Sequence, residues 1–295
     1  MSLVHPLQER LSDRAMPPLL APGVFDGLSA AMAQQAGAEA LYLSGASLAY
    51  TRFGWPDIGL ISMAEVAETI SVISDRVSLP LIVDADTGFG NALNVQRTVR
   101  LFAKAGASSI QLEDQTLPKR CGHLAGKTLV SRAEMVGKIE AAKDALLDHD
   151  CLLIARTDAI ALEGLERALE RAECYLDAGA DILFVEAPPD QAAMTAITSR
   201  FADRVPLVAN MVEGGKTPLL PLSELGVLGF QLVIYPGAFV RALSYLGTHF
   251  YRELIISGGT QDWQDRMLDL TGLNDLLGTQ QLLDLGRKYD PEAER

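Results

Sequence analysis

Acidic side chains close neighbouring apolar runs of this chain, at positions where they could share one ion. Asp84 and Asp86 follow one such run, and Glu113 closes the next. Residues two apart in an extended segment point to the same face, so both aspartates can face one cation. Oxygen ligands without convergent histidines, or cysteines at zinc spacing, favour Mg2+, with Mn2+ as a substitute. A single aspartate is more often a turn former, but three together predict a metal site.

An arginine and an asparagine end further apolar runs. Arg156 could stabilise a developing oxyanion or a substrate carboxylate, or pair with Glu186 at the end of the following run, and both roles are compatible. Asn210 precedes residues 213–218, whose amide, hydroxyl and backbone donors could hold another carboxylate or could simply form a turn.

A long connection, residues 114–130, follows Glu113 and contains Cys121. Structureless connections longer than about 12–15 residues are often lids over active sites. Cationic neighbours lower the pKa of a thiol, which makes Cys121 a candidate acid–base group or nucleophile. The basic side chains beside this thiol in sequence are Lys119, Arg120 and His123.

Strands alternating with helices must position these groups. Helical runs end repeatedly in a small glycine-containing step just before a short apolar run, and such a glycine turns the chain back after a helix. These steps contain Gly37, Gly106, Gly179 and, more loosely, Gly226. Capping-box spacing marks helix starts at Ser62 with Glu65 and at Ser131 with Glu134.

Eight apolar runs are strand candidates. They span residues 19–24, 41–44, 81–84, 110–113, 152–156, 182–186, 207–210 and 232–235. Continuous apolar runs are typical of parallel strands covered on both faces. Because no GxGxxG turn or Walker sequence occurs, we expect a TIM-type (β/α)8 barrel rather than an open doubly wound sheet. The carboxyl ends of such strands carry the active site, which would bring the polar residues above together.

The barrel is expected to occupy residues 1–258 and to end in a long helix at 238–257. Residues 259–295 would form a C-terminal helical extension with breaks at Gly272 and Gly278. An apolar extension that its own barrel cannot cover usually docks on a partner subunit, so we expect an oligomer.

Composition excludes several partners. The chain has 295 residues, with 25 lysines and arginines against 38 aspartates and glutamates, which gives a net charge of −13. This balance argues against nucleic-acid and membrane-surface binding. An odd count of three cysteines favours a reducing cytoplasm, and Cys151 and Cys174 look like packing thiols. We expect a small-molecule ligand.

Several motifs together resemble the isocitrate lyase/phosphoenolpyruvate mutase superfamily, from Pro22 to about Ser257. They are residues 22–26, 44–46, 56–57, 84–90, 113–114, 119–123 and 156–159. The resemblance implies a Mg2+-dependent (β/α)8 barrel that acts through an enolate of an α-oxo acid. It also implies a homotetramer, a dimer of dimers whose subunits swap C-terminal helices.

The resemblance further implies roles for individual residues. Asp84, Asp86 and Glu113 would hold Mg2+, partly through water, with Asp57 close to the metal. Arg156 would stabilise the enolate oxygen. The pyruvyl carboxylate would be held by Ser44, Gly45 and Ala46. The remaining candidates are Tyr42, Lys119, His123 and Glu186 in catalysis and Gly122 and Asn210 in substrate binding.

Residues 119–123 resemble the carbon–carbon lyase branch, in which the thiol protonates the departing carbanion, whereas mutases carry asparagine there. Residues 185–188 and 210–218 resemble dimethylmalate lyases and petal-death proteins. Leu124 stands where 2-methylisocitrate lyases typically have arginine. The lost cation favours a substrate with one carboxylate fewer. We therefore expect cleavage of a 2-substituted malate, such as dimethylmalate or citramalate, to pyruvate and a carboxylic acid.

Alternatives remain at this stage. A 2-methylisocitrate lyase, or an oxaloacetate decarboxylase or hydrolase, would use the same metal-enolate site. The relevant decarboxylases carry histidine near the eighth strand, where this chain has Tyr235 and Pro236. The general base is open between Tyr42 and Glu186, each of which could also serve packing or a salt bridge. A non-catalytic barrel would not need both the acidic cluster and an activated thiol.

Overall fold

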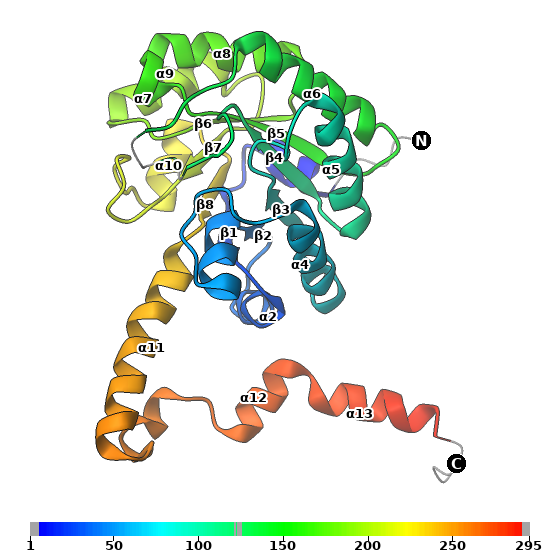
Figure 1. Ribbon diagram of the computed structural model, residues 1–295, viewed down its shortest axis with the longest axis vertical. Helices are drawn as coiled ribbons and strands as arrows, with labels where there is room; N and C mark the ends of the chain where they lie inside the picture. Colours follow the sequence, from blue (N-terminus) through cyan, green and yellow to red (C-terminus); the bar gives the residue numbers. More distant parts are fainter. Residues whose placement is uncertain (1–5, 121, 123–125, 291–295) are drawn as a thin grey trace.

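A nearly closed barrel of eight parallel strands forms the body of the molecule (Figure 1). The computed structural model describes residues 6–120, 122 and 126–290. The strands are β1 (Leu19–Val24), β2 (Leu41–Leu43), β3 (Leu81–Asp84), β4 (Ser109–Glu113), β5 (Leu152–Thr157), β6 (Ile182–Val185), β7 (Val208–Asn210) and β8 (Leu232–Tyr235). Their order is β6-β5-β4-β3-β2-β1-β8-β7, and an isolated parallel bridge between Leu183 and Leu207 joins β6 to β7. The predicted TIM-type barrel is confirmed.

Helices cover the outside of this barrel (Figure 1). The covering helices are α2 (Gly27–Gln35), α4 (Met63–Arg76), α5 (Ala92–Ala105), α6 (Arg132–Leu146), α8 (Leu165–Asp177), α9 (Gln191–Phe201) and α10 (Leu222–Leu228). Short segments α3 (Gly45–Leu48), the π-helix Ala49–Phe53 and α7 (Ile160–Glu163) follow strand ends. Ser62 and Glu65 form the expected capping box of α4, whereas Ser131 caps α6 by accepting from the amide of Glu134.

Strand alternation decides which side chains reach the barrel mouth. In β5, Leu152 and Ile154 pack inside the barrel, while Leu153 and Ala155 face the covering helices. Arg156 continues the inner row at the carboxyl end of this strand. At the opposite end, the helix α1 (Pro6–Ser12) inserts Leu7 and Leu11 into the inner cluster, a plug that the sequence patterns did not predict.

The glycine steps behave as expected at three of the four positions. Gly37, Gly106 and Gly179 adopt φ of 90°, 115° and 102°, the left-handed region that favours glycine. Gly226 instead lies within α10, and Gly229 ends that helix with φ 106°. Gly226 is required for another reason, because a Cβ there would lie 2.9 Å from Cδ of Pro18.

A helical arm extends from the barrel (Figure 1). It consists of α11 (Ala238–Ser257), the 3-10 helix Gln261–Arg266, α12 (Leu270–Leu277) and α13 (Thr279–Lys288). The break predicted at Gly278 is confirmed, since Gly278 ends α12, but Gly272 lies inside that helix, where its amide donates to Asp269. The arm returns toward the barrel, and Arg76 donates to the carbonyl of Leu276 at 2.7 Å. The domain boundary at residue 258 stays a prediction.

The arm leaves large apolar side chains uncovered. On α11, Tyr251, Ile255 and Ile256 are 64%, 80% and 79% exposed. Exposed apolar rows of this kind are typical of surfaces that contact a partner, and the expected oligomer stays a prediction. Within the described ranges, no helix is both long and apolar enough to span a membrane.

Candidate active site

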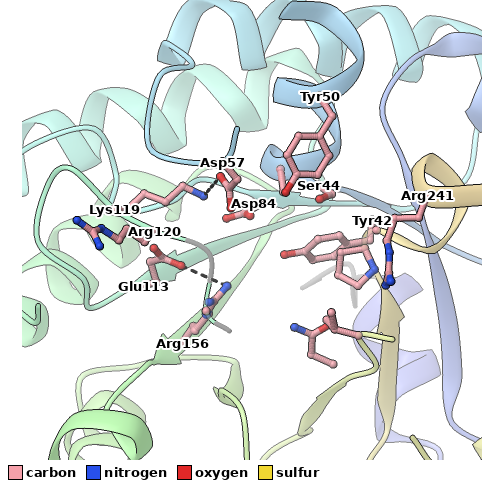
Figure 2. Close-up of a pocket in the computed structure, with 16 residues that line it drawn as sticks. Tyr42, Ser44, Tyr50, Asp57, Asp84, Glu113, Lys119, Arg120, Arg156 and Arg241 are labelled. Atoms are coloured by element: carbon pink, nitrogen blue, oxygen red, sulfur yellow. Dashed lines mark ion pairs between the residues drawn. The ribbon is translucent and has the colours of Figure 1, made fainter. Parts of the chain in front are cut away.

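A cavity of about 130 Å³ opens at the carboxyl ends of the strands (Figure 2). Ten of the residues predicted from sequence line it: Tyr42, Ser44, Ala46, Asp57, Asp84, Glu113, Lys119, Gly122, Arg156 and Asn210. Asp86, Gly45 and Glu186 contact these residues without lining the cavity themselves. Cys121, His123 and Leu124 lie outside the described residues. The barrel therefore gathers the described candidates in one place.

The end of β2 brings a helix start to the acidic residues. Ser44 caps α3 by accepting from the amide of Ser47 at 3.2 Å. A Cβ on Gly45 would lie 3.4 Å from Oδ2 of Asp84 and 3.5 Å from Oδ1 of Asp86. The glycine thus leaves open space between the two carboxylates and the first turn of α3.

Lys119 neutralises part of the acidic cluster. Its Nζ lies 2.5 Å from Oδ1 of Asp57 and 2.7 Å from Oδ1 of Asp86. Burial works to lower the pKa of Lys119, but Asp86 and Asp57 outweigh it and raise that pKa well above its usual value. Burial raises the pKa of Asp86 to about 6 even with Lys119 beside it. One buried ammonium therefore leaves the cluster short of positive charge.

The fit of a divalent cation can be judged from these oxygens. No three acidic, histidine or cysteine side chains of the described residues gather tightly enough to form a preassembled metal centre. However, Oε1 of Glu113 is buried without a hydrogen-bond partner, and the space beside Gly45 faces Asp84 and Asp86. Mg2+ keeps several of its waters and needs few direct carboxylates, so this donor set fits it.

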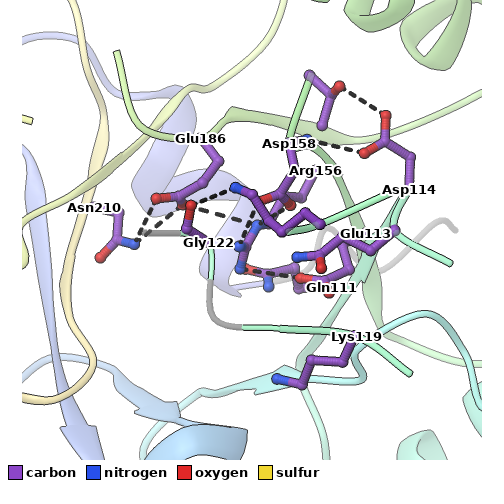
Figure 3. Close-up of polar contacts among 12 residues, drawn as sticks. Gln111, Glu113, Asp114, Lys119, Gly122, Arg156, Asp158, Glu186 and Asn210 are labelled. Atoms are coloured by element: carbon purple, nitrogen blue, oxygen red, sulfur yellow. Dashed lines mark hydrogen bonds and ion pairs between the residues drawn. The ribbon is translucent and has the colours of Figure 1, made fainter. Parts of the chain in front are cut away.

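Arg156 lies at the centre of a second buried cluster (Figure 3). Its Nε and Nη2 donate to the Asp158 carboxylate at 3.0 and 3.1 Å. Its Nη1 lies 3.2 Å from Oε2 of Glu113, and its Nε lies 3.8 Å from Oε2 of Glu186. The expected pairing with Glu186 is thus weaker than those with Asp158 and Glu113. Burial opposes the charge, but the carboxylates outweigh it and raise the pKa of Arg156, which keeps the guanidinium charged.

Glu186 and Asn210 meet across the gap between β6 and β7. The Nδ2 of Asn210 donates to Oε2 of Glu186 at 3.1 Å, which fixes the amide orientation (Figure 3). The Oδ1 of Asn210 is buried and accepts no hydrogen bond in the described structure. Ala187 follows with φ 56°, a strained backbone conformation of the kind found at functional sites.

A buried amide, which the sequence patterns did not single out, connects Tyr42 to Asp84. The Tyr42 hydroxyl donates to Oε1 of Gln111 at 2.9 Å, and Nε2 of Gln111 donates to Oδ1 of Asp84 at 3.3 Å. Burial, and then the charge of Asp84, raises the pKa of Tyr42 well above its usual value. Gln111 occupies an inner position of β4. A polar residue inside an apolar strand is the sequence feature that could have identified it.

The connection between β4 and α6 is more ordered than a structureless lid. Its two ends pair through a bridge between Gln115 and Leu129, and Gln115 also accepts from the amide of Arg120 at 3.0 Å. Gly122 packs against the second cluster, since a Cβ there would lie 2.4 Å from Nη2 of Arg156. Lys119, Arg120 and Gly122 of this segment line the cavity, and its role as a lid stays a prediction.

A further arginine lines the cavity, and sequence reasoning missed it. Figure 2 shows Arg241 across the cavity from Lys119. The Nη1 of Arg241 donates to the Glu213 carbonyl at 2.6 Å and lies 3.0 Å from its Oε2. Glu213 therefore holds Arg241 at the cavity, while residues 213 and 214 form a turn and none of residues 213–218 lines the cavity. The position of Arg241 in the first turn of α11, just after β8, could have identified it from sequence.

The fold and the site together define a (β/α)8-barrel enzyme that acts on a small molecule at the carboxyl ends of its strands. Residues 8–254 match the phosphoenolpyruvate phosphomutase family model. The chain belongs to this family, within the phosphoenolpyruvate mutase/isocitrate lyase superfamily, as its motifs predicted.

Two curated relatives narrow the reaction class. The chain is 40% identical to 2,3-dimethylmalate lyase of Eubacterium barkeri over 98% of this chain and 99% of the relative. It is 46% identical to 2-methylisocitrate lyase of Aeropyrum pernix over 88% and 83%. These relatives confirm the prediction of a carbon–carbon lyase.

Solved structures agree with the fold. Oxaloacetate acetylhydrolase in complex with 3,3-difluorooxalacetate superimposes with a TM-score of 0.89 at 33% identity, covering 96% of this chain and 95% of the other. Phosphonopyruvate hydrolase in complex with oxalate and Mg2+ superimposes with a TM-score of 0.85 at 31% identity, covering 96% and 97%.

Proposed function

We propose that this enzyme is a Mg2+-dependent lyase that cleaves a 2-substituted malate, such as dimethylmalate or citramalate, to pyruvate and a carboxylic acid. The observation that carries the proposal is the buried Arg156 guanidinium, held at the cavity wall 3.2 Å from Glu113 and beside the acidic cluster. A fixed cation in a site of low polarity stabilises a negative oxygen strongly. The similarity to 2,3-dimethylmalate lyase over nearly the full length of both chains supports the choice of substrate.

The metal assignment rests on the donor set. Asp84, Asp86 and Glu113 would hold Mg2+, partly through water, with Mn2+ as a substitute and Asp57 nearby. The presence of Mg2+ with oxalate in a related solved structure supports this choice. Held by these carboxylates, Mg2+ would supply a Lewis acid that polarises the substrate's 2-hydroxyl and carboxylate.

Binding roles follow from position. Ser44, Gly45 and Ala46 would hold the carboxylate that becomes part of pyruvate, because α3 begins there and its amide groups are available to an anion. The unpartnered Oδ1 of Asn210 would accept a hydrogen bond from the substrate. Gly122 would keep the loop backbone close to the reacting carbon.

The cleavage itself needs a base and an acid. A base takes the proton of the 2-hydroxyl, the C2–C3 bond breaks, and its electron pair passes to the leaving acid as an aci-carboxylate. Arg156 stabilises the negative oxygen on the pyruvate side, and the Cys121 thiol delivers a proton to the leaving carbon. We favour Glu186 as base over Tyr42, because burial raises the pKa of Tyr42 well above its usual value, so its hydroxyl stays protonated. Lys119 would assist by keeping positive charge beside Asp57 and Asp86, and His123 stays a catalytic candidate from the family motif.

Pyruvate release tests this proposal directly. We expect pyruvate from 2,3-dimethylmalate or citramalate with Mg2+, and a fall in kcat of about 10²-fold in Cys121→Ser, because the serine hydroxyl is a far weaker acid. The control is Cys174→Ser, on α8. The measurement is a coupled pyruvate assay offering both malates, 2-methylisocitrate and oxaloacetate.

Other results of this assay would favour one of the alternative functions. A clear preference for 2-methylisocitrate would reject the malate substrate but keep the lyase. Turnover of oxaloacetate alone, unaffected by Cys121→Ser, would reject the lyase proposal in favour of decarboxylation or hydrolysis at the same site.

We also propose that the arm joins subunits into a homotetramer with swapped C-terminal helices. Ile255→Asp with Ile256→Asp is expected to lower the mass measured by light scattering, because charge would be buried in the interface. Val227→Asp is the matched control, since Val227 is 90% exposed on α10, away from the arm. A wild-type monomer at micromolar concentration would contradict the proposal.

A further inference from the structure

Lys127 is a buried lysine in the connection between β4 and α6. Its side chain is 2% exposed, and its Nζ donates to Oδ1 of Asp158 at 2.9 Å. The same ammonium also donates to the carbonyl oxygen of Gly122. One buried cation therefore binds both the backbone beside the cavity and a carboxylate from the β5 end.

Asp158 is shared between two cations. Its carboxylate accepts from Nε and Nη2 of Arg156 as well as from Lys127, and its side chain is fully buried. Its own amide donates to Oδ1 of Asp114 at 2.9 Å, which fixes the residue at the start of the connection. Any shift of the Asp158 carboxylate therefore changes the hydrogen bonds that orient the Arg156 guanidinium.

The loop backbone also lies against the Arg156 guanidinium. Gly122 lies so close to the guanidinium that a Cβ would meet Nη2 at 2.4 Å and Cγ of Glu186 at 2.8 Å (Figure 3). Lys127 binds the carbonyl of this same glycine. The loop backbone, the guanidinium and the Asp158 carboxylate thus form one packed unit around a single ammonium group.

We propose that Lys127 is a positioning residue, which couples the place of the β4–α6 connection to the orientation of Arg156 through Asp158. The proposal rests on the proposed function for the role of Arg156, but the coupling itself does not depend on the substrate. Removing the ammonium leaves the buried Asp158 with one cation fewer and the Gly122 carbonyl without this donor, so both are expected to shift.

Kinetics separate positioning from a merely structural role. Lys127→Met keeps the length of the side chain and removes its charge. We expect kcat to fall about 10- to 100-fold with little change in KM, because a small misplacement of a catalytic group costs rate. Lys127→Arg should recover part of kcat. The control is Lys143→Met, which removes a lysine 2.7 Å from Asp181 on the outside of the barrel. Unchanged kcat in folded Lys127→Met would overturn the proposal.

Hydrogen exchange gives a readout that needs no turnover. In Lys127→Met, the amides of Thr116 and Val130, which bond to Thr128 and Asp114, should exchange faster than in wild type and in Lys143→Met. Asp158→Asn should accelerate hydrogen exchange at the same amides. The double variant should show little further acceleration beyond that of either single variant, because the two residues act as one unit. If no malate is cleaved but exchange responds this way, the proposed substrate fails and the coupling stands. Independent, additive effects would reject the coupling.

Discussion

Replacing Arg156 with methionine is expected to lower kcat by about 10²–10³-fold and the free energy of unfolding by about 3–5 kcal/mol. The rate falls because the cation at the cavity wall is lost. The stability falls because Asp158 and Glu113, 1% exposed each, lose the guanidinium that lies 3.0 and 3.2 Å away. A pyruvate assay and urea unfolding measure the two effects.

The stability loss should depend on pH. Burial alone would raise the pKa of Asp158, but Arg156 and Lys127 outweigh it and hold that pKa below its usual value. A carboxylate with a lowered folded-state pKa adds stability above its unfolded pKa, and this is lost as pH falls through the folded value. Arg156→Met removes part of this contribution. The difference in the free energy of unfolding between wild type and Arg156→Met is therefore expected to be largest near neutral pH and to shrink below about pH 4.

Two variants bracket the effect. Arg156→Lys keeps the charge without the two-pronged geometry, so it should retain more stability than rate. Arg200→Met removes an arginine that pairs with Glu166 and Glu173 at the surface, and it should cost little of either. A fully active Arg156→Met enzyme would remove the basis of the proposed mechanism.

Mg2+ is expected to raise the melting temperature of the wild-type enzyme, and Asp84→Asn to abolish both this rise and turnover. At a hundred times its Kd, a ligand of the folded state adds about 2.7 kcal/mol. Oδ1 of Asp84 accepts from the amide of Asp86 and from Gln111, while Oδ2 faces the space beside Gly45. The asparagine keeps the size of the side chain and removes its negative charge.

The control for this experiment is Asp144→Asn, an exposed position on α6. Thermal melts with increasing Mg2+, after treatment with a chelator, measure binding without any substrate. An equal rise in Asp84→Asn would locate the cation elsewhere in the protein. Full turnover by chelator-treated wild type would reject the metal requirement.

The ends of the strands were the structural feature that the sequence predicted best. Runs such as 19–24 and 232–235 match β1 and β8 at both bounds, because buried parallel strands leave long apolar stretches between polar ends. Ser44 is one residue beyond β2, where it caps α3 instead. The family motifs then indicated roles for individual residues, which strand ends alone do not assign.

Residues whose importance comes from distant contacts were not accessible in this way. Lys127 follows the Cys121 motif and looks like a surface lysine in the sequence. Only the fold shows that it is buried against Asp158. Gln111 interrupts an apolar run without a local reason, and its partners Tyr42 and Asp84 come from two other strands. Such pairings depend on strand register, which sequence periodicity does not specify.

The gap between β6 and β7 is the weakest join in the barrel wall, with an isolated bridge near its base at Leu183 and Leu207. At the open end, Glu186 and Asn210 reach across this seam through side chains alone. In the proposed function, residues at the substrate would therefore also join the two sides of the barrel wall. A ligand that engaged both residues would strengthen this join, so part of its binding free energy would go into stabilising the barrel.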